Sequence, residues 1–170
     1  MAWSTANDRA GTGVPGVVYD TILNNAIGAL MNFTDPIYGE GVFIWLPGVA
    51  STVAGDVVEY TTGNGVANPT GSTTRWAGTA NSGKPLAIAT AAIVASMWGW
   101  YQISGQAVVN ISGTVAAADK AYWQATGVVF STLTAGKQVN GMVAVSANAV
   151  PAAGKATYQI QFPVAQGNIT

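Results

Sequence analysis

The side chains that carry most enzymatic chemistry are missing from this chain. Its 170 residues include no histidine and no cysteine, so imidazole bases and thiolate nucleophiles are excluded. Among the carboxylates, Asp56 and Glu59 fall close together, but on a strand they would face opposite sides of the sheet. Asp35 and Glu40 can approach each other across a turn, yet calcium needs about six to eight oxygen ligands. We therefore predict solvated turn acids, no catalytic residue, no metal and no cofactor.

Three glycine–lysine pairs, Gly83-Lys84, Gly136-Lys137 and Gly154-Lys155, are the only hint of phosphate binding. A phosphate-binding loop requires Ser or Thr after the lysine and a helix behind it. None of the three lysines is followed by Ser or Thr. The pairs are better explained as hairpin turns that carry an exposed charge.

Aromatic side chains are the remaining candidates for binding. The densest group is Trp98-Gly99-Trp100-Tyr101-Gln102-Ile103. On a strand, Trp98 and Trp100 would share one face, while Tyr101 and Ile103 would share the other. Stacked tryptophans can bind sugar, but polar partners are scarce beside this group. Packing in a core or an interface, where tryptophan is a preferred anchor, is the favoured interpretation.

The elements that must position these side chains come from a chain very poor in charge. Only 8% of the residues are charged, against about 25% in ordinary soluble domains. The segment 85–118 carries no charge at all. Free solution favours a densely charged surface, so we expect much of this surface to lie against other protein. The net charge of −1 gives no field to attract nucleic acid. The apolar segment 86–101 is shorter than the roughly 20 residues of a membrane span.

Alanine, valine, glycine and threonine dominate the composition, which favours sheet over helix. Short runs of strand-forming residues alternate with glycine turns, a pattern typical of an all-β antiparallel sandwich or barrel, jelly-roll-like. We expect residues 1–40 to form an extended N-terminal arm with one short helix at 21–32, and residues 41–170 to form the β domain. The expected strands are 42–46, 56–61, 73–77, 86–90, 98–103, 107–111, 121–125, 128–132, 141–145 and 157–162.

Two segments resemble each other. Residues 52–60 and 114–122 both read as Thr-Val-Ala, a corner of small residues, an aspartate, and a strand that reaches tyrosine. Residues 133–137 are a fainter third copy. We interpret the copies as one favourable corner used repeatedly, with duplication as the alternative.

Four stretches of the sequence together resemble the small decoration, or cement, proteins of tailed-bacteriophage capsids. In that family a Gly-Trp-x-Gln-x-Ser-Gly strand is followed by an Ala/Val strand and a corner that ends in Asp-x-x-Tyr. The resemblance spans roughly residues 40–165, and the arm before it has no counterpart. The stretches are Lys84 to Ala89, Trp98 to Val109, Thr52 to Val58, and Thr114 to Tyr122.

The resemblance implies a β-rich structural virion protein without catalysis, a homotrimer on the outer capsid surface. Its partners would be further copies of itself and the major capsid protein, with no nucleic acid and no membrane. The alternatives are a carbohydrate-binding module that uses surface tryptophans, or a virion fibre or surface subunit. The candidate residues for the oligomer or capsid interface are Trp3, Arg9, Trp45, Trp76, Trp98, Trp100 and Tyr101.

Overall fold

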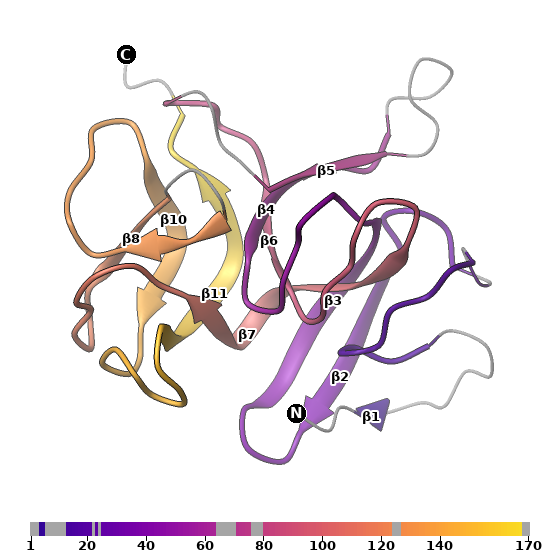
Figure 1. Ribbon diagram of the computed structural model, residues 1–170, viewed down its shortest axis with the longest axis horizontal. Coiled ribbons are helices and arrows are strands. Elements are labelled where there is room, and N and C mark those ends of the chain that lie inside the picture. Colours follow the sequence, from indigo (N-terminus) through magenta and orange to yellow (C-terminus); the bar gives the residue numbers. More distant parts are fainter. Residues whose placement is uncertain are drawn as a thin grey trace.

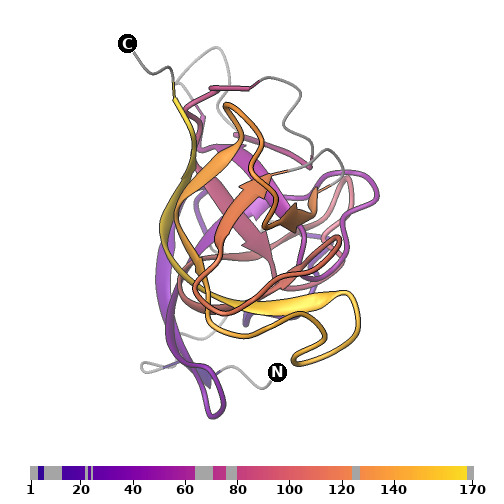
Figure 2. The ribbon, with the colours of Figure 1, turned by 90° about the vertical axis from the view of Figure 1, so that its left-hand side faces the viewer.

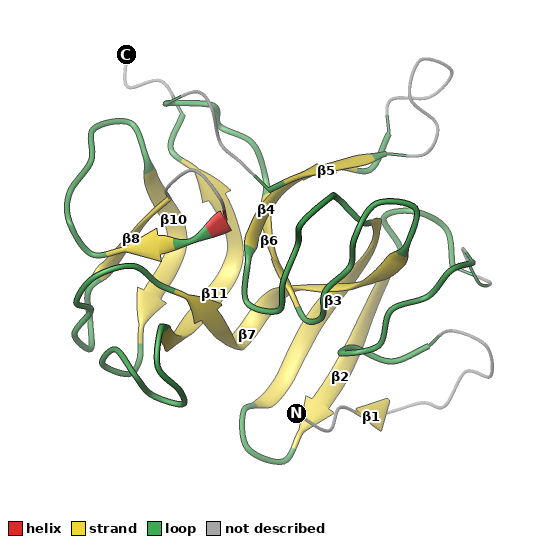
Figure 3. Cartoon of the chain, viewed as in Figure 1, coloured by secondary structure: helices red, strands yellow, loops and turns green. Residues whose placement is uncertain are grey.

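The computed structural model confirms the all-β fold class (Figures 1 and 3). It describes residues 4–5, 13–21, 23, 25–63, 71–75, 80–123 and 127–167. Within these residues the only helical piece is a single turn at Gly127, red in Figure 3, and no helix is long and apolar enough to cross a membrane. The strands are β1 (Ser4–Thr5), β2 (Leu30–Asp35), β3 (Gly39–Pro47), β4 (Val57–Thr61), β5 (Ser72–Thr74), β6 (Leu86–Ala89), β7 (Trp98–Asn110), β8 (Lys120–Trp123), β9 (Val129–Phe130), β10 (Gln138–Ala144) and β11 (Lys155–Ala165).

The strands form one curled antiparallel sheet in the order β1-β2-β3-β7-β11-β10-β8-β9. β4 lies off this path, pairing with β5 and with β6, and β6 pairs in turn with β7. Figure 2 shows the sheet curling around its own interior. β7 is the central strand, because its first half pairs with β3 and its second half with β11 (Figure 1).

A bend at Gly105 lets β7 serve both halves of the sheet. Gly105 has φ +98, and a Cβ at this position would meet the Glu40 carbonyl oxygen at 2.5 Å. The buried Gln102 side chain supports the bend, since its Nε2 donates to the carbonyl oxygens of Ser104 at 3.1 Å and Gln106 at 2.9 Å. The segments 98–103 and 107–111, expected as two strands, are thus largely one bent strand that ends at Asn110.

Two hydrophobic cores lie on opposite faces of the β4–β6 layer. Alternate side chains of this layer point to opposite sides, so β6 and the first three residues of β4 are buried on both faces. Val57, Leu86 and Ile88 belong to the large core, with Trp123, Tyr158 and the inward residues of β7, β8, β10 and β11. Val58, Ala87 and Ala89 belong to the small core, with Leu46, Tyr101 and Ile103.

A third cluster is aromatic and consists of Phe33, Phe43, Trp45 and Trp100, all fully buried. Tyr19 and Ile27 from the preceding segment pack against this aromatic cluster. The backbone of that segment is fixed to the sheet, because Tyr19 and Trp98 exchange N–H to carbonyl hydrogen bonds of 2.9 and 2.8 Å.

The helix expected at 21–32 is wrong. In the described part of that range, Leu23 and Gly28 have φ of 53 and 85, which an α-helix cannot contain, and β2 begins at Leu30. The helical spacing of apolar residues was coincidental, since Leu30 is 58% exposed while Phe33 is buried. The boundary expected at residue 40 falls within the β2–β3 hairpin, whose register runs from Leu30↔Ile44 to Asp35↔Gly39.

The corner shared by residues 52–60 and 114–122 has the same geometry in both places. The Asp56 N–H donates to the Val53 carbonyl at 3.1 Å, and the Asp119 N–H donates to the Ala116 carbonyl at 3.2 Å. In each corner the aspartate side chain accepts from the first N–H of the turn. The faint third copy closes the same way, from Lys137 N–H to the Thr134 carbonyl at 3.1 Å. Such turns need a residue with positive φ at the third position, and Gly55, Ala118 and Gly136 have φ of 95, 71 and 74.

Candidate interaction surface

The aromatic residues expected at an interface lie mainly inside the subunit. Trp45, Trp100 and Tyr101 are 0% exposed, so they cannot contact a partner while the subunit stays folded. Their interface assignment is therefore corrected to a core assignment. The expected division of faces is confirmed: Trp98 and Trp100 belong with the aromatic cluster, whereas Tyr101 and Ile103 lie in the small core.

The remaining interface candidates divide into two kinds. Trp98 is only partly buried and packs at the edge of the aromatic cluster. Trp3, Arg9 and Trp76 lie outside the described residues. Trp123 is 1% exposed in the large core. Among the tryptophans that the structure describes, none offers the open ring face that sugar stacking requires.

The fold also removes charge from an already charge-poor surface. Asp56 is fully buried, and its carboxylate accepts from Arg75 Nε at 2.5 Å, Val53 N–H at 2.9 Å and Asn110 Nδ2 at 2.9 Å. Lys155 Nζ joins this network by donating to Asn110 Oδ1 at 2.8 Å. Three charged side chains, Asp56, Arg75 and Lys155, are thus engaged in one network, with the neutral Asn110 as the link to Lys155.

The other acids are partly engaged as well. Glu59, 7% exposed, accepts from Lys84 Nζ at 3.3 Å and from Ser82 Oγ at 3.2 Å. Asp35 accepts from the N–H groups of Ile37 and Tyr38 at 2.7 and 3.0 Å, so this turn acid caps its own turn. Within the described residues no group of histidine, cysteine or acidic residues is arranged to hold a metal ion. Across the same residues the exposed charged residues are Asp20, Glu40, Lys84 and Lys120, and the others are buried or partly buried.

Gly136-Lys137 and Gly154-Lys155 lie at turns, as predicted, whereas Gly83-Lys84 lies in a loop that leads into β6. Gly83, Gly136 and Gly154 have φ of 64, 74 and 71, the left-handed region that glycine enters freely. Their lysines differ from the prediction, since Lys84 pairs with Glu59 and Lys155 points into the Asp56 network.

Exposed apolar side chains lie at positions that the sequence reasoning missed. Ile37, 77% exposed, occupies the tip of the β2–β3 hairpin, which reaches the lower edge of the molecule in Figure 1. The hydrogen bonds to Asp35 hold this tip in shape. The available signal was the sequence Asp35-Pro36-Ile37-Tyr38-Gly39, a turn motif with an apolar residue at its apex.

The outer side of the second half of the sheet is also almost free of charge. Directly opposite residues share one face of a sheet, and Gln106, Gln159 and Val143 are opposite one another on β7, β11 and β10. Gln161 lies on the same face of β11 as Gln159, and Val143 is 45% exposed. We call Gln106, Val143, Gln159 and Gln161 the glutamine face. Lys120, opposite Val143, is the charge at its border.

Buried tyrosines account for the perturbed ionisable groups. Burial, together with the smaller effect of the Asp119 charge, raises the pKa of Tyr158 to about 12. Burial also raises the pKa of Tyr101 far above its usual range, while a hydrogen bond from Thr73 opposes the shift. Both side chains lie in cores and face no cleft, so these shifts indicate packing rather than a catalytic acid.

Comparisons of the chain with protein-family models, with curated proteins and with solved structures find no match.

Proposed function

We propose that this chain is a structural virion protein that decorates a tailed-phage capsid as a homotrimer and clamps neighbouring major capsid subunits. The observation that carries the proposal is the poverty of free charge. The folded chain has 7933 Å² of accessible surface, and the exposed charged residues of its described part are Asp20, Glu40, Lys84 and Lys120. A monomer with so few surface charges would have low solubility. A surface that is permanently covered by other protein does not require those charges.

The glutamine face is assigned to contact between copies. A glutamine amide both donates and accepts hydrogen bonds, so a face of glutamines can meet the same chemistry on another copy without charge repulsion. A standard interface takes about 800 Å² from each partner, roughly a tenth of this subunit's surface. The two cores on opposite faces of the β4–β6 layer also support a structural role, because close packing on both sides of this layer makes the subunit stiff.

The hairpin tip at Ile37 is assigned to the shell. It combines a fully exposed branched apolar side chain with a turn held by two hydrogen bonds to Asp35. Such a preorganised apolar knob loses little conformational entropy when it enters a pocket.

Light scattering and co-sedimentation with empty heads of the parent phage test the proposal together. The expected result is a trimer that sediments with the heads, and an Ile37→Ser variant that remains trimeric but sediments less. A chain that stays monomeric at high concentration and does not sediment with the heads would overturn the proposal.

A further inference from the structure

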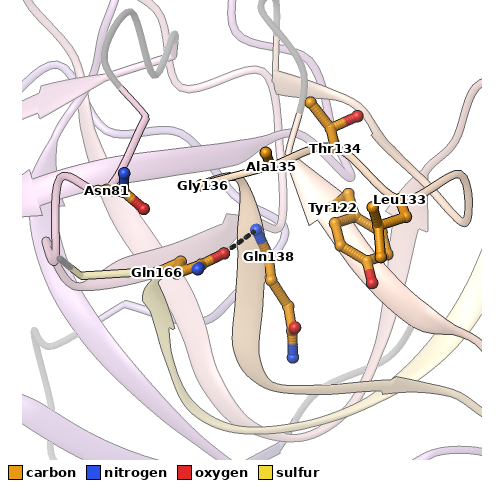
Figure 4. Close-up of a pocket in the computed structure, with 8 residues that line it drawn as sticks. All are labelled: Asn81, Tyr122, Leu133, Thr134, Ala135, Gly136, Gln138 and Gln166. Carbon is orange, nitrogen blue, oxygen red and sulfur yellow. Dashed lines mark hydrogen bonds between the residues drawn. The ribbon is translucent and has the colours of Figure 1, made fainter. Parts of the chain in front are cut away.

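A groove of about 460 Å³ lies beside β8 and the start of β10, on the same outer side of the sheet as Val143 but at the opposite end of β10. We call it the amide groove. Figure 4 shows Asn81 and Gln166 toward one side and Tyr122 and Leu133 toward the other. Its volume falls within the range of about 300–1,000 Å³ that small-molecule sites occupy. Its lining residues are Asn81, Tyr122, Leu133, Thr134, Ala135, Gly136, Gln138 and Gln166.

Backbone hydrogen bonds hold the walls of the amide groove in place. Asn81 N–H donates to the Gly136 carbonyl at 2.8 Å, and Gln166 N–H donates to the Gln138 carbonyl at 2.8 Å. A second hydrogen bond joins the same two residues, because Gln166 Oε1 accepts from the Gln138 N–H at 3.3 Å. Three segments far apart in sequence are thus fixed to one another before any ligand arrives, as a binding site requires.

Gly136 leaves room for the Asn81 side chain. A Cβ at Gly136 would lie 2.9 Å from Asn81 Oδ1 and 2.7 Å from the Ala80 Cβ. Since Gly136 also has φ +74, a side chain here would both strain the turn and displace the amide. The glycine therefore keeps a polar group at the wall of the groove.

Several side-chain groups of the groove are left for a ligand, although the side chains of Gln166 and Thr134 hydrogen-bond within the protein. In the part of the chain that the structure describes, the side-chain amides of Asn81 and Gln138 and the hydroxyl of Tyr122 make no intramolecular hydrogen bond. Each amide presents both donors and acceptors, and the tyrosine hydroxyl does so too. Among the described residues that line the groove none is charged, so nothing in this lining favours a phosphate, a carboxylate or a cation.

We propose that the amide groove binds a neutral saccharide. A sugar hydroxyl is itself both donor and acceptor, so several side-chain amides and one tyrosine hydroxyl match an uncharged polyol. The Tyr122 ring, 6% exposed, forms a wall, and the 76% exposed Leu133 supplies apolar surface for the C–H face of a sugar. A peptide added as a β-strand is less suited, because β10 is already paired with β8 and β11. The proposal does not depend on the capsid role.

The test is a nuclear magnetic resonance titration of the full chain with maltose, cellobiose, lactose and N,N′-diacetylchitobiose. We expect at least one disaccharide to shift the backbone amide resonances of Gly136, Gln138 and Gln166. Gln138→Met keeps the length of the side chain and removes its hydrogen bonds, so it should weaken binding by about 2- to 10-fold. Asn148→Leu, which also replaces an amide by an apolar side chain but at an exposed loop residue outside the groove and the glutamine face, is the control and should leave the affinity unchanged.

Two results would overturn the proposal. One is the absence of any shift at the groove with all four disaccharides, and the other is equal weakening by Gln138→Met and Asn148→Leu. Trialanine serves as a neutral peptide probe, and groove shifts with it alone would assign the site to peptides instead. Trimer formation and head binding are measured separately, so the two proposals fail independently.

Discussion

Trp45 on β3 and Trp100 on β7 occupy directly opposite positions in the sheet, with ring centroids 5.2 Å apart and ring planes at 65°. Phe33 stacks edgewise on Trp100 at 5.4 Å, and Tyr19 contacts Trp45 at 5.6 Å. The cross-strand tryptophan pair thus joins β2, β3, β7 and the segment that precedes β2. Its burial explains why the most aromatic strand of the sequence is a core element rather than a binding surface.

Trp100→Ala should lower the free energy of unfolding by about 3–5 kcal/mol, because a fully buried indole leaves a cavity among rigid neighbours. Chemical denaturation monitored by circular dichroism measures the loss. Trp98→Ala is the control and should cost less, since Trp98 is partly exposed. Equal midpoints for Trp100→Ala and the parent chain would contradict the core assignment.

The two corner aspartates provide a second comparison. Asp56→Ala should cost about 3–5 kcal/mol of stability, because it leaves Arg75 and Asn110 without their buried partner. Asp119→Ala removes one turn hydrogen bond at a partly exposed site and should cost about 0.5–1.5 kcal/mol. Urea denaturation of both variants measures the difference. Similar losses at the two sites would show that the Asp56 network adds nothing to the corner itself.

Gly105→Ala should be among the most damaging glycine substitutions. The new Cβ would meet backbone atoms, the Glu40 oxygen at 2.5 Å and the Gly41 Cα at 3.0 Å, and β7 could not bend without moving β3. Gly39→Ala is the matched control, because Gly39 has φ +76 but no atom near its Cβ position, so only the left-handed strain of about 1–2 kcal/mol remains. Thermal unfolding of the two variants should separate these contributions, and equal melting temperatures would contradict the steric argument.

Tyr158 should make stability fall in alkaline solution. Burial, and then the Asp119 charge, raise its folded-state pKa to about 12, above the unfolded value of about 10. Between these values the unfolded chain loses a proton that the folded chain retains, so the free energy of unfolding decreases as pH rises. Tyr158→Phe should flatten this decrease between about pH 10 and pH 12.

The same variant tests the packing at pH 7. The Tyr158 hydroxyl is buried and makes no hydrogen bond within the described part of the chain. Tyr158→Phe should therefore keep or raise stability at neutral pH, since an unsatisfied buried hydroxyl is unfavourable. A marked loss of stability would reveal a hydrogen-bond partner for this hydroxyl.

Gln159→Glu should weaken self-association, because it places one like charge per copy on the glutamine face without changing the size of the side chain. Sedimentation equilibrium should show more monomer at pH 7, and association should recover at high salt or below about pH 4, where glutamate is protonated. Asn148→Asp, an amide-to-acid change at an exposed loop residue, is the control. An unaffected trimer would remove the glutamine face from the interface.

The local elements of this fold could be predicted from the sequence. Pleat alternation is a property of each strand alone, so it placed Trp100 and Tyr101 on opposite faces, and the structure puts them in separate clusters. The corners around Asp56 and Asp119 were visible because turn formation depends on the few residues of the turn. The sequence also predicted strands that overlap β3, β4, β6, β8, β10 and β11, because strand and turn preferences likewise act over a few neighbouring residues.

Tertiary structure alone decided what those elements do. Nothing local distinguishes Asp56 from Asp119, yet only Asp56 meets Arg75 and Asn110, because three distant strand ends converge on its corner. Residues 21–32 gave an apparent helical spacing, but the described residues Leu23, Ile27 and Ala29 pack against the aromatic cluster instead. The amide groove likewise joins Asn81, Gln138 and Gln166 from separate segments. Local preferences act over a few residues, whereas the choice of buried face and binding surface depends on long-range strand pairing, which a single sequence does not display.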